Sequence, residues 1–130
     1  MASMKTLSLL AAPLALSACT MVPPPESTPP QPQGYAVPLG VPVRVGDLVV
    51  TPKKLVEDSR CPMNARCVWA GRVVVTTRIV GPDFSDTADL TLGEPFGTHG
   101  KMLALSSVRP ERMTNTTLEP GDYRFTYEMR

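Results

Sequence analysis

The sequence predicts an all-β domain, a small antiparallel sandwich or barrel of six to seven short strands. Apolar and polar residues alternate in several short runs, which is the pattern of strands with one buried face. Turn-forming residues separate these runs, and the 130 residues include 15 prolines and 9 glycines. No stretch repeats its apolar residues at helical spacing. A chain of this length supports one modest core, so a single folded domain is expected.

The first two strands are predicted over residues 41–45 and 48–50. Valines recur at alternate positions in the first run, and Gly46-Asp47 supplies a two-residue turn into the second. We expect Pro52 to interrupt the second strand before a separate run at 54–58, because proline cannot donate a hydrogen bond to a neighbouring strand.

The two clearest strands are predicted over residues 72–80 and 123–129. In the first of them, one face presents the side chains of Val73, Val75, Thr77 and Ile79. In the second, the alternation places larger side chains on one face, those of Tyr123, Phe125, Tyr127 and Met129. Shorter strands are expected around Leu90 and Leu92 and around Met102, Leu103 and Leu105.

The N-terminal residues have the order of a secretory signal. Lys5 precedes an apolar run from Leu7 to Leu16, and small residues then lead to Cys19. The apolar run is shorter than the roughly 20 residues that a transmembrane helix needs. We therefore expect residues 1–18 to be a signal peptide.

The stretch Leu16-Ser17-Ala18-Cys19 resembles the lipobox of bacterial lipoproteins. That resemblance implies that Cys19 is lipidated and becomes the mature N-terminus, with more than one acyl chain, including palmitate, in the membrane. Thr20 follows in place of an aspartate, which favours the outer membrane. The protein is therefore expected in the bacterial cell envelope, attached to the outer membrane and facing the periplasm.

Residues 19–40 read as a lipidated cysteine followed by a proline-rich linker, and residues 41–130 as the β domain. The linker contains few charged residues and lacks apolar periodicity, so it favours polyproline II. At this extension it would span on the order of 50–60 Å. The interpretation is a stiff tether, and the alternative is a docking peptide for a proline-binding partner.

Cys61 and Cys67 remain once Cys19 is assigned to the anchor. In an exported chain, such a pair is expected to form a disulfide, which contributes about 2 kcal/mol for so short a loop. The spacing differs from that of thioredoxin-like redox centres. A metal site would need further ligands, and His99, in a glycine-bounded turn, is the only histidine. We therefore expect no metal and no cofactor.

The most distinctive motif covers residues 57–71. It resembles a stretch in an uncharacterised group of bacterial envelope lipoproteins, which share the pattern Asp-Ser-Arg-Cys-Pro followed by Cys-Val-Trp-Ala-Gly. The valine strand that follows and the closing Asp122-Tyr123-Arg124 are similar too. This resemblance implies a class of protein and no particular activity.

Trp69, the only tryptophan, has two interpretations. We favour packing over the disulfide as part of the core. In the alternative, Arg60, Arg66 and Arg72 combine with the indole into a binding site for an anionic group, a sugar or a protein. A local ion pair between Arg60 and Asp58 is the simpler assignment for that arginine.

Charge and motif content exclude several classes of function. Without Lys5 the chain has twelve basic residues against twelve acidic ones, which argues against nucleic acid as a partner. No nucleophile with a base, paired carboxylate motif or nucleotide-binding glycine pattern is recognisable, so catalysis is not expected. The sequence favours a non-enzymatic binding or structural module that contacts an envelope protein or cell-wall component. The alternative is an inhibitor of an envelope protease or wall-lytic enzyme.

Overall fold

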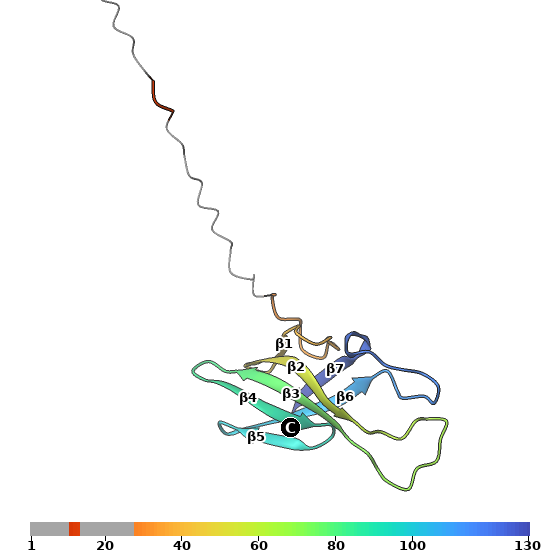
Figure 1. Ribbon diagram of the computed structural model, residues 1–130. Coiled ribbons are helices and arrows are strands. Elements are labelled where there is room, and N and C mark those ends of the chain that lie inside the picture. The colour runs from red at the N-terminus through yellow and green to blue at the C-terminus, as the bar shows by residue number, and fades with distance from the viewer. Residues whose placement is uncertain (1–10, 14–27) are drawn as a thin grey trace, which may run out of the picture.

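The structure, a computed structural model, describes residues 11–13 and 28–130, so Cys19 and most of the predicted signal peptide lie outside the described residues. Seven strands form two antiparallel sheets, which confirms the all-β prediction (Figure 1). The strands are β1 (Val43–Val45), β2 (Leu48–Asp58), β3 (Val73–Val80), β4 (Ser85–Thr91), β5 (Pro95–Thr98), β6 (Lys101–Arg109) and β7 (Arg124–Met129). In the described chain the only helical element is a 3-10 turn, η1 (Pro120–Asp122).

The first sheet has the order β1-β2-β3-β4 and the second the order β5-β6-β7. Val45 pairs with Leu48, so Gly46 and Asp47 form the predicted two-residue turn. In the described residues no helix is long and apolar enough to span a bilayer.

The core lies between the sheets and is filled from both of them. The predicted alternation of β3 is confirmed, because its inward side chains are all buried: Val73, Val75, Thr77 and Ile79. On the opposite sheet the aromatic residues predicted for the last strand point into the same core: Tyr123, Phe125 and Tyr127. Burial of these apolar side chains is the main source of stability in so small a domain.

One buried hydrogen bond joins the two sheets. The hydroxyls of Thr77 on β3 and Tyr127 on β7 lie 3.0 Å apart in the core. The Thr77 hydroxyl also lies 3.2 Å from the Val75 carbonyl, to which it can donate. Burial raises the pKa of the Tyr127 phenol well above its usual range. The phenol is therefore neutral and keeps the proton that it needs for its hydrogen bond with Thr77.

Strand β2 continues through Pro52, contrary to the predicted interruption. The Pro52 carbonyl accepts a 2.7 Å hydrogen bond from the amide of Gly40, on the side of β2 away from β3. A residue's N–H and C=O point to the same side of a strand, so the missing N–H of Pro52 removes no bond to β3. A register shift follows between Pro52 and Lys54.

The folded domain begins before residue 41, because the end of the predicted linker pairs with both sheets. Gln31 forms a parallel bridge with Val43 of β1, and Val37 forms an antiparallel bridge with Phe125 of β7. Val37 is buried among the core residues. The linker predicted over 19–40 is therefore shorter at its C-terminal end.

Candidate functional site

The candidate site is the connection between β2 and β3, residues 59–72, called the stapled loop below. Its two ends are joined because the Ser59 amide donates a 2.8 Å hydrogen bond to the Arg72 carbonyl. The Arg72 amide donates in return to the Ser59 hydroxyl at 2.9 Å. Gly71 has a φ of 64°, and a Cβ there would lie 2.0 Å from the Ser59 carbonyl oxygen. Only glycine fits this narrow neck.

A disulfide between Cys61 and Cys67 closes the loop, as predicted from the cysteine count. The Cα atoms of the pair are 5.8 Å apart. Within the ring, Pro62 begins a turn in which its carbonyl accepts a 3.1 Å hydrogen bond from the Ala65 amide. The ring is thus held by a covalent bond and by an internal turn.

The stapled loop also packs against the connection between β6 and β7. The Met63 amide donates to the Arg112 carbonyl at 2.8 Å. The Asn64 side chain makes two bonds with Thr114, donating to its hydroxyl at 2.6 Å and accepting from its amide at 2.8 Å. Sequence patterns could not reveal this docking, because it joins loops about fifty residues apart.

Arg60 faces inward and binds Asp58 through two nitrogens, each 2.9 Å from a carboxylate oxygen. Its guanidinium also donates to the carbonyls of Val108 and Pro110, at 3.0 and 3.1 Å. The two charged side chains are only 13% and 5% exposed. The simpler assignment made from the sequence is correct, and Arg60 is not free to bind a ligand.

Two further residues complete what we call the Asp58 clamp, consisting of Asp58, Arg60, Arg112 and Tyr123. The Tyr123 hydroxyl donates to the Asp58 carboxylate at 2.7 Å, and the Arg112 guanidinium donates to the Arg60 carbonyl at 2.8 Å. The clamp ties the start of the stapled loop to residues of the second sheet and its β6–β7 connection.

The clamp shifts the ionisation of its members. Burial alone would raise the pKa of Asp58, but hydrogen bonds from Arg60 and Tyr123 outweigh it and lower that pKa. The hydrogen bond with Asp58 raises the pKa of Arg60. Burial, together with the bond to Asp58, raises the pKa of Tyr123 to about 12. At neutral pH the clamp therefore combines an ionised carboxylate, two guanidinium groups and a neutral phenol.

The other two predicted arginines lie at the surface and differ from each other. Arg72 pairs with Glu57 at 2.6 Å. Arg66 is exposed, and among the described residues no carboxylate oxygen lies within 4.0 Å of its guanidinium. Of the three arginines, Arg66 is the one available to a partner.

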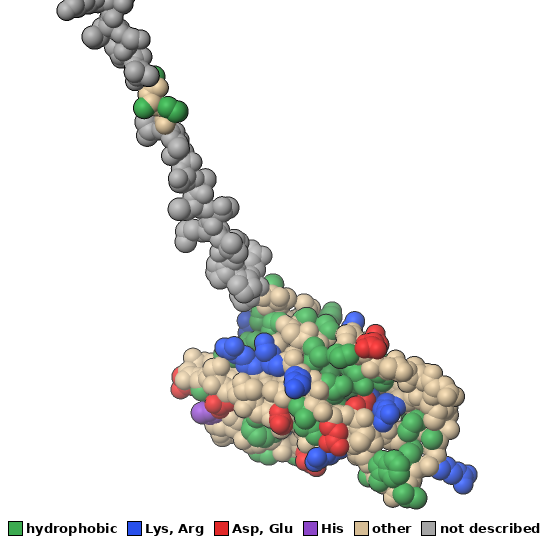
Figure 2. Space-filling view, in the orientation of Figure 1, with side chains coloured by type: hydrophobic (Ala, Val, Ile, Leu, Met, Phe, Trp, Pro, Cys, Tyr) green, Lys and Arg blue, Asp and Glu red, His purple; other side chains and the backbone are tan. Residues whose placement is uncertain are grey.

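Trp69 is 62% exposed, so the expectation that it packs in the core is wrong. The loop instead docks on the β6–β7 connection through Met63 and Asn64, and its base is held by the Asp58 clamp. Val68 and Met63 are also exposed, at 98% and 68%. Figure 2 shows hydrophobic side chains gathered over this loop at the lower right, with a Lys or Arg side chain projecting beside them. Met113, on the β6–β7 connection, is exposed as well.

Chemically, the stapled loop offers apolar surface and one cation. Among the described residues no group of three or more His, Cys, Asp or Glu side chains could hold a metal ion. His99 lies away from the loop, at the β5–β6 turn, where it stacks on Phe84 and its Nε2 lies 2.7 Å from an Asp86 oxygen. The exposed apolar side chains of the stapled loop, together with Arg66, are suited to contact with the surface of another molecule.

The chain matches no family model, no curated protein and no solved structure.

Proposed function

We propose that this chain is a lipid-anchored, non-enzymatic binding module of the bacterial envelope, and that the stapled loop binds an envelope protein. The observation that carries the proposal is the exposure of Trp69 on a loop with a rigid base. Tryptophan and arginine are the residue types most enriched in interface hot spots, and Arg66 stands three residues before Trp69.

The rigidity of the loop favours binding. Ordering a flexible loop on association costs free energy for each immobilised side chain. Here the disulfide, the Asn64–Thr114 contact and the Asp58 clamp hold the backbone before any partner arrives. More of the interaction energy of Trp69 is therefore available for affinity.

The loop is also placed away from the point where the chain joins the domain. Gln31 bridges to Val43, and Val43 pairs with Val50 near the beginning of β2. The stapled loop leaves the other end of that strand, after Asp58. Eight residues of strand separate Val50 from Asp58, a distance of about 26 Å. A chain anchored through Cys19 would thus present the loop away from its tether.

The test is cross-linking and pull-down of the anchored protein from intact cells, comparing the natural chain with Trp69→Ala and Arg66→Ala. Tyr35→Ala is the matched control, because Tyr35 is an aromatic residue with similar exposure, 58%, outside the loop. We expect a protein captured by the natural chain and by Tyr35→Ala, and lost from both loop variants with unchanged circular dichroism. Equal capture of the protein by all four chains contradicts the proposal. Capture of cell-wall material without any protein contradicts it as well.

A second candidate is inhibition of an envelope protease or wall-lytic enzyme. The observation in its favour is the seven-residue disulfide ring, Cys61 to Cys67, whose backbone is held from two sides. A ring of this kind can fill an active-site cleft without being ordered on binding. Assays against envelope proteases and wall-lytic enzymes test it, and absence of inhibition at micromolar protein would remove this candidate.

The anchor is tested separately by mass spectrometry of the mature N-terminus. We expect diacyl or triacyl modification of Cys19, and loss of membrane attachment in Cys19→Ser. An unmodified Cys19 would end the proposed localisation while leaving the loop experiment interpretable.

A further inference from the structure

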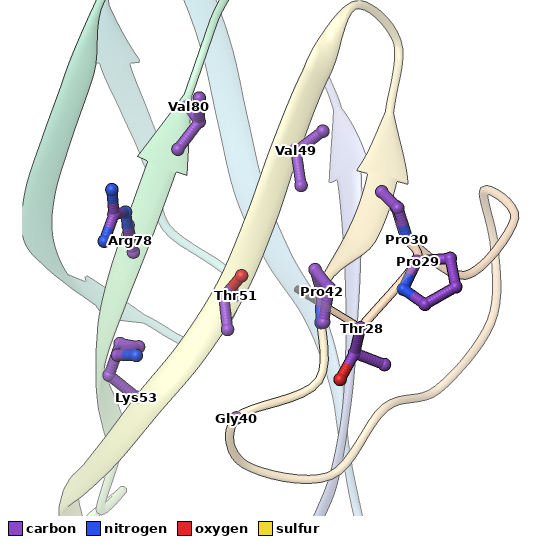
Figure 3. A pocket seen from close by; sticks show the side chains of 10 residues that line it. All are labelled: Thr28, Pro29, Pro30, Gly40, Pro42, Val49, Thr51, Lys53, Arg78 and Val80. Carbon is purple, nitrogen blue, oxygen red and sulfur yellow. The ribbon is translucent and has the colours of Figure 1, made fainter. Parts of the chain in front are cut away.

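A groove of about 700 Å³ lies on the outer face of the four-stranded sheet, where the chain enters the domain (Figure 3). Its floor is formed by Val49 and Val80, which pair across β2 and β3. Pro29 and Pro30 form one wall. The volume is within the range of small-ligand sites. The groove is far from the stapled loop.

Two cations stand on the side of the groove opposite the prolines, Lys53 on β2 and Arg78 on β3 (Figure 3). Thr51 pairs directly with Arg78 across β2 and β3, and both residues line the groove. Within the described part of the chain, neither cation has a carboxylate oxygen within 4.0 Å. Two like charges without a counter-ion favour a ligand with a negative group.

An acidic residue on the same face of β4 is already engaged. Asp89 pairs with Thr76 in register and accepts a 2.7 Å hydrogen bond from its hydroxyl. The groove itself has no acidic residue in its lining. An anion entering it therefore meets Lys53, Arg78 and apolar surface.

The groove is preformed by backbone hydrogen bonds. Gln31, directly after the proline wall, donates to the Pro42 carbonyl at 2.9 Å, and its carbonyl accepts from the Arg44 amide at 2.8 Å. The Gly40–Pro52 bond closes the lower margin. Proline has no N–H, so the wall offers apolar surface, and the donors come from the two cations and the threonine hydroxyls.

The number of residues between Cys19 and the groove limits how far the groove can lie from a membrane that carries the anchor. Nine residues, 20–28, lead from Cys19 to the groove, so their covalent reach is at most about 32 Å. We propose that the groove binds the phosphate of an anionic phospholipid headgroup in the membrane that carries the anchor. This inference rests on the proposed lipidation of Cys19. The tether raises the local concentration of headgroups at the groove, so a weak individual site suffices.

The experiment uses the chain from Thr20 onward, which lacks acyl chains and contains the entire core, from Val37 to Tyr127. Its binding is measured by sedimentation with phosphatidylcholine vesicles and with vesicles containing phosphatidylglycerol, at low and high salt. We expect binding to the anionic vesicles alone, lost at high salt. Lys53→Gln combined with Arg78→Gln should weaken binding about 25-fold, since each cation near an anionic bilayer contributes about five-fold.

The matched control is Arg124→Gln combined with Arg130→Gln, which removes the same charge around β7 of the other sheet. We expect at most a two-fold loss from it, and normal circular dichroism in both double variants. If the two double variants weaken vesicle binding equally, binding depends on overall charge and the proposed role of the groove is wrong.

Two further probes distinguish the source of the anion. Inorganic phosphate that binds at Arg78 as tightly as the vesicles do, observed by NMR, would reassign the groove to free phosphate. Poly-glutamate binding that depends on Lys53, without vesicle binding, would reassign it to an acidic protein. None of these measurements involves Trp69, so failure here leaves the loop proposal standing, and failure of the pull-down leaves the groove result unaffected.

Discussion

The Tyr123 hydroxyl donates a 2.7 Å hydrogen bond to the Asp58 carboxylate, across 65 positions of the chain. Asp58 ends β2, and Tyr123 immediately precedes β7 in the other sheet. Arg60 holds the same carboxylate through two nitrogens. This contact therefore couples the base of an exposed loop to the packing of the sandwich, so stability and loop geometry depend on the same group.

Replacement of Asp58 by Asn is expected to destabilise the domain by about 3 kcal/mol, because the largely buried Arg60 guanidinium loses its two-point carboxylate partner and keeps only the partly exposed Glu111, 3.8 Å away. Urea unfolding measures the loss. Glu57→Gln is the control, since its ion pair with Arg72 is at the surface and is worth roughly 1 kcal/mol or less. Similar losses of stability in the two variants would show that the Asp58 clamp stabilises the domain no more than a surface ion pair does.

The clamp also predicts how stability changes with pH. The pKa of Asp58 is lowered in the folded chain, so its stabilisation is complete above the unfolded pKa of about 3.9 and is lost as pH falls through the folded value. Tyr123 has its pKa raised to about 12, so its contribution is complete below about pH 10 and is lost as pH rises toward the folded value.

The contribution of Tyr123 at alkaline pH can be isolated by comparing the unfolding of the natural chain with that of Tyr123→Phe at pH 8, 10 and 11. The stability advantage of the natural chain should shrink above pH 10. A stability difference that stays constant across this range would contradict the assigned direction, and the comparison cancels the effects of all groups that the two chains share.

Gly71→Ala should destabilise the domain by about 3 kcal/mol or more, because its Cβ would meet the Ser59 carbonyl oxygen in a backbone conformation that already disfavours side chains. Gly93→Ala separates the two effects, since Gly93 has a φ of 82° with no atom within 4 Å of the added Cβ. It should cost only about 1–2 kcal/mol. Thermal unfolding of both variants tests the difference, and equal costs would exclude a steric role for Ser59.

Loss of the disulfide in Cys61→Ala combined with Cys67→Ala should lower stability by about 2 kcal/mol, the loop-closure entropy of a short ring. The domain should still fold at 25 °C, because the core and the Asp58 clamp remain. Chemical denaturation gives the stability, and pull-down gives the partner affinity. Unchanged affinity in the folded variant would indicate that preorganisation by the disulfide is unimportant.

Thr77→Val should cost about 1–3 kcal/mol, because it leaves the buried Tyr127 hydroxyl without its partner. Adding Tyr127→Phe should recover much of that loss, since both polar groups are then absent. A double-mutant cycle by urea unfolding measures the coupling. Additive losses would mean that the hydroxyl pair does not stabilise the contact between the sheets.

The strands that could be predicted are those with one buried face, because their apolar and polar residues alternate along the sequence. Thr77 and Phe125 belong to such runs, and both are buried as expected. Pro52 misled the prediction because the cost of proline depends on which neighbour its missing N–H would face. That side is occupied by Gly40, from a segment without any strand pattern.

The remaining differences arise from contacts between distant segments. Val37 lies in a proline-rich stretch with no periodicity, and its burial depends on the bridge to Phe125. Trp69 is exposed on a loop whose base is held by Tyr123 and Arg112, and contacts with residues so far along the chain have no local sequence pattern. The anchor at Cys19 stays a prediction, since it lies outside the described residues.

The pairing of Gln31 with β1 and of Val37 with β7 also has a mechanical consequence. In a chain held at Cys19 and bound to a partner at Trp69, any tension between membrane and partner enters the domain at residues 28–31. The hydrogen bonds of Gln31 carry that load first, and the Val37–Phe125 bridge passes it to the second sheet. Force is thereby shared between both layers of the sandwich.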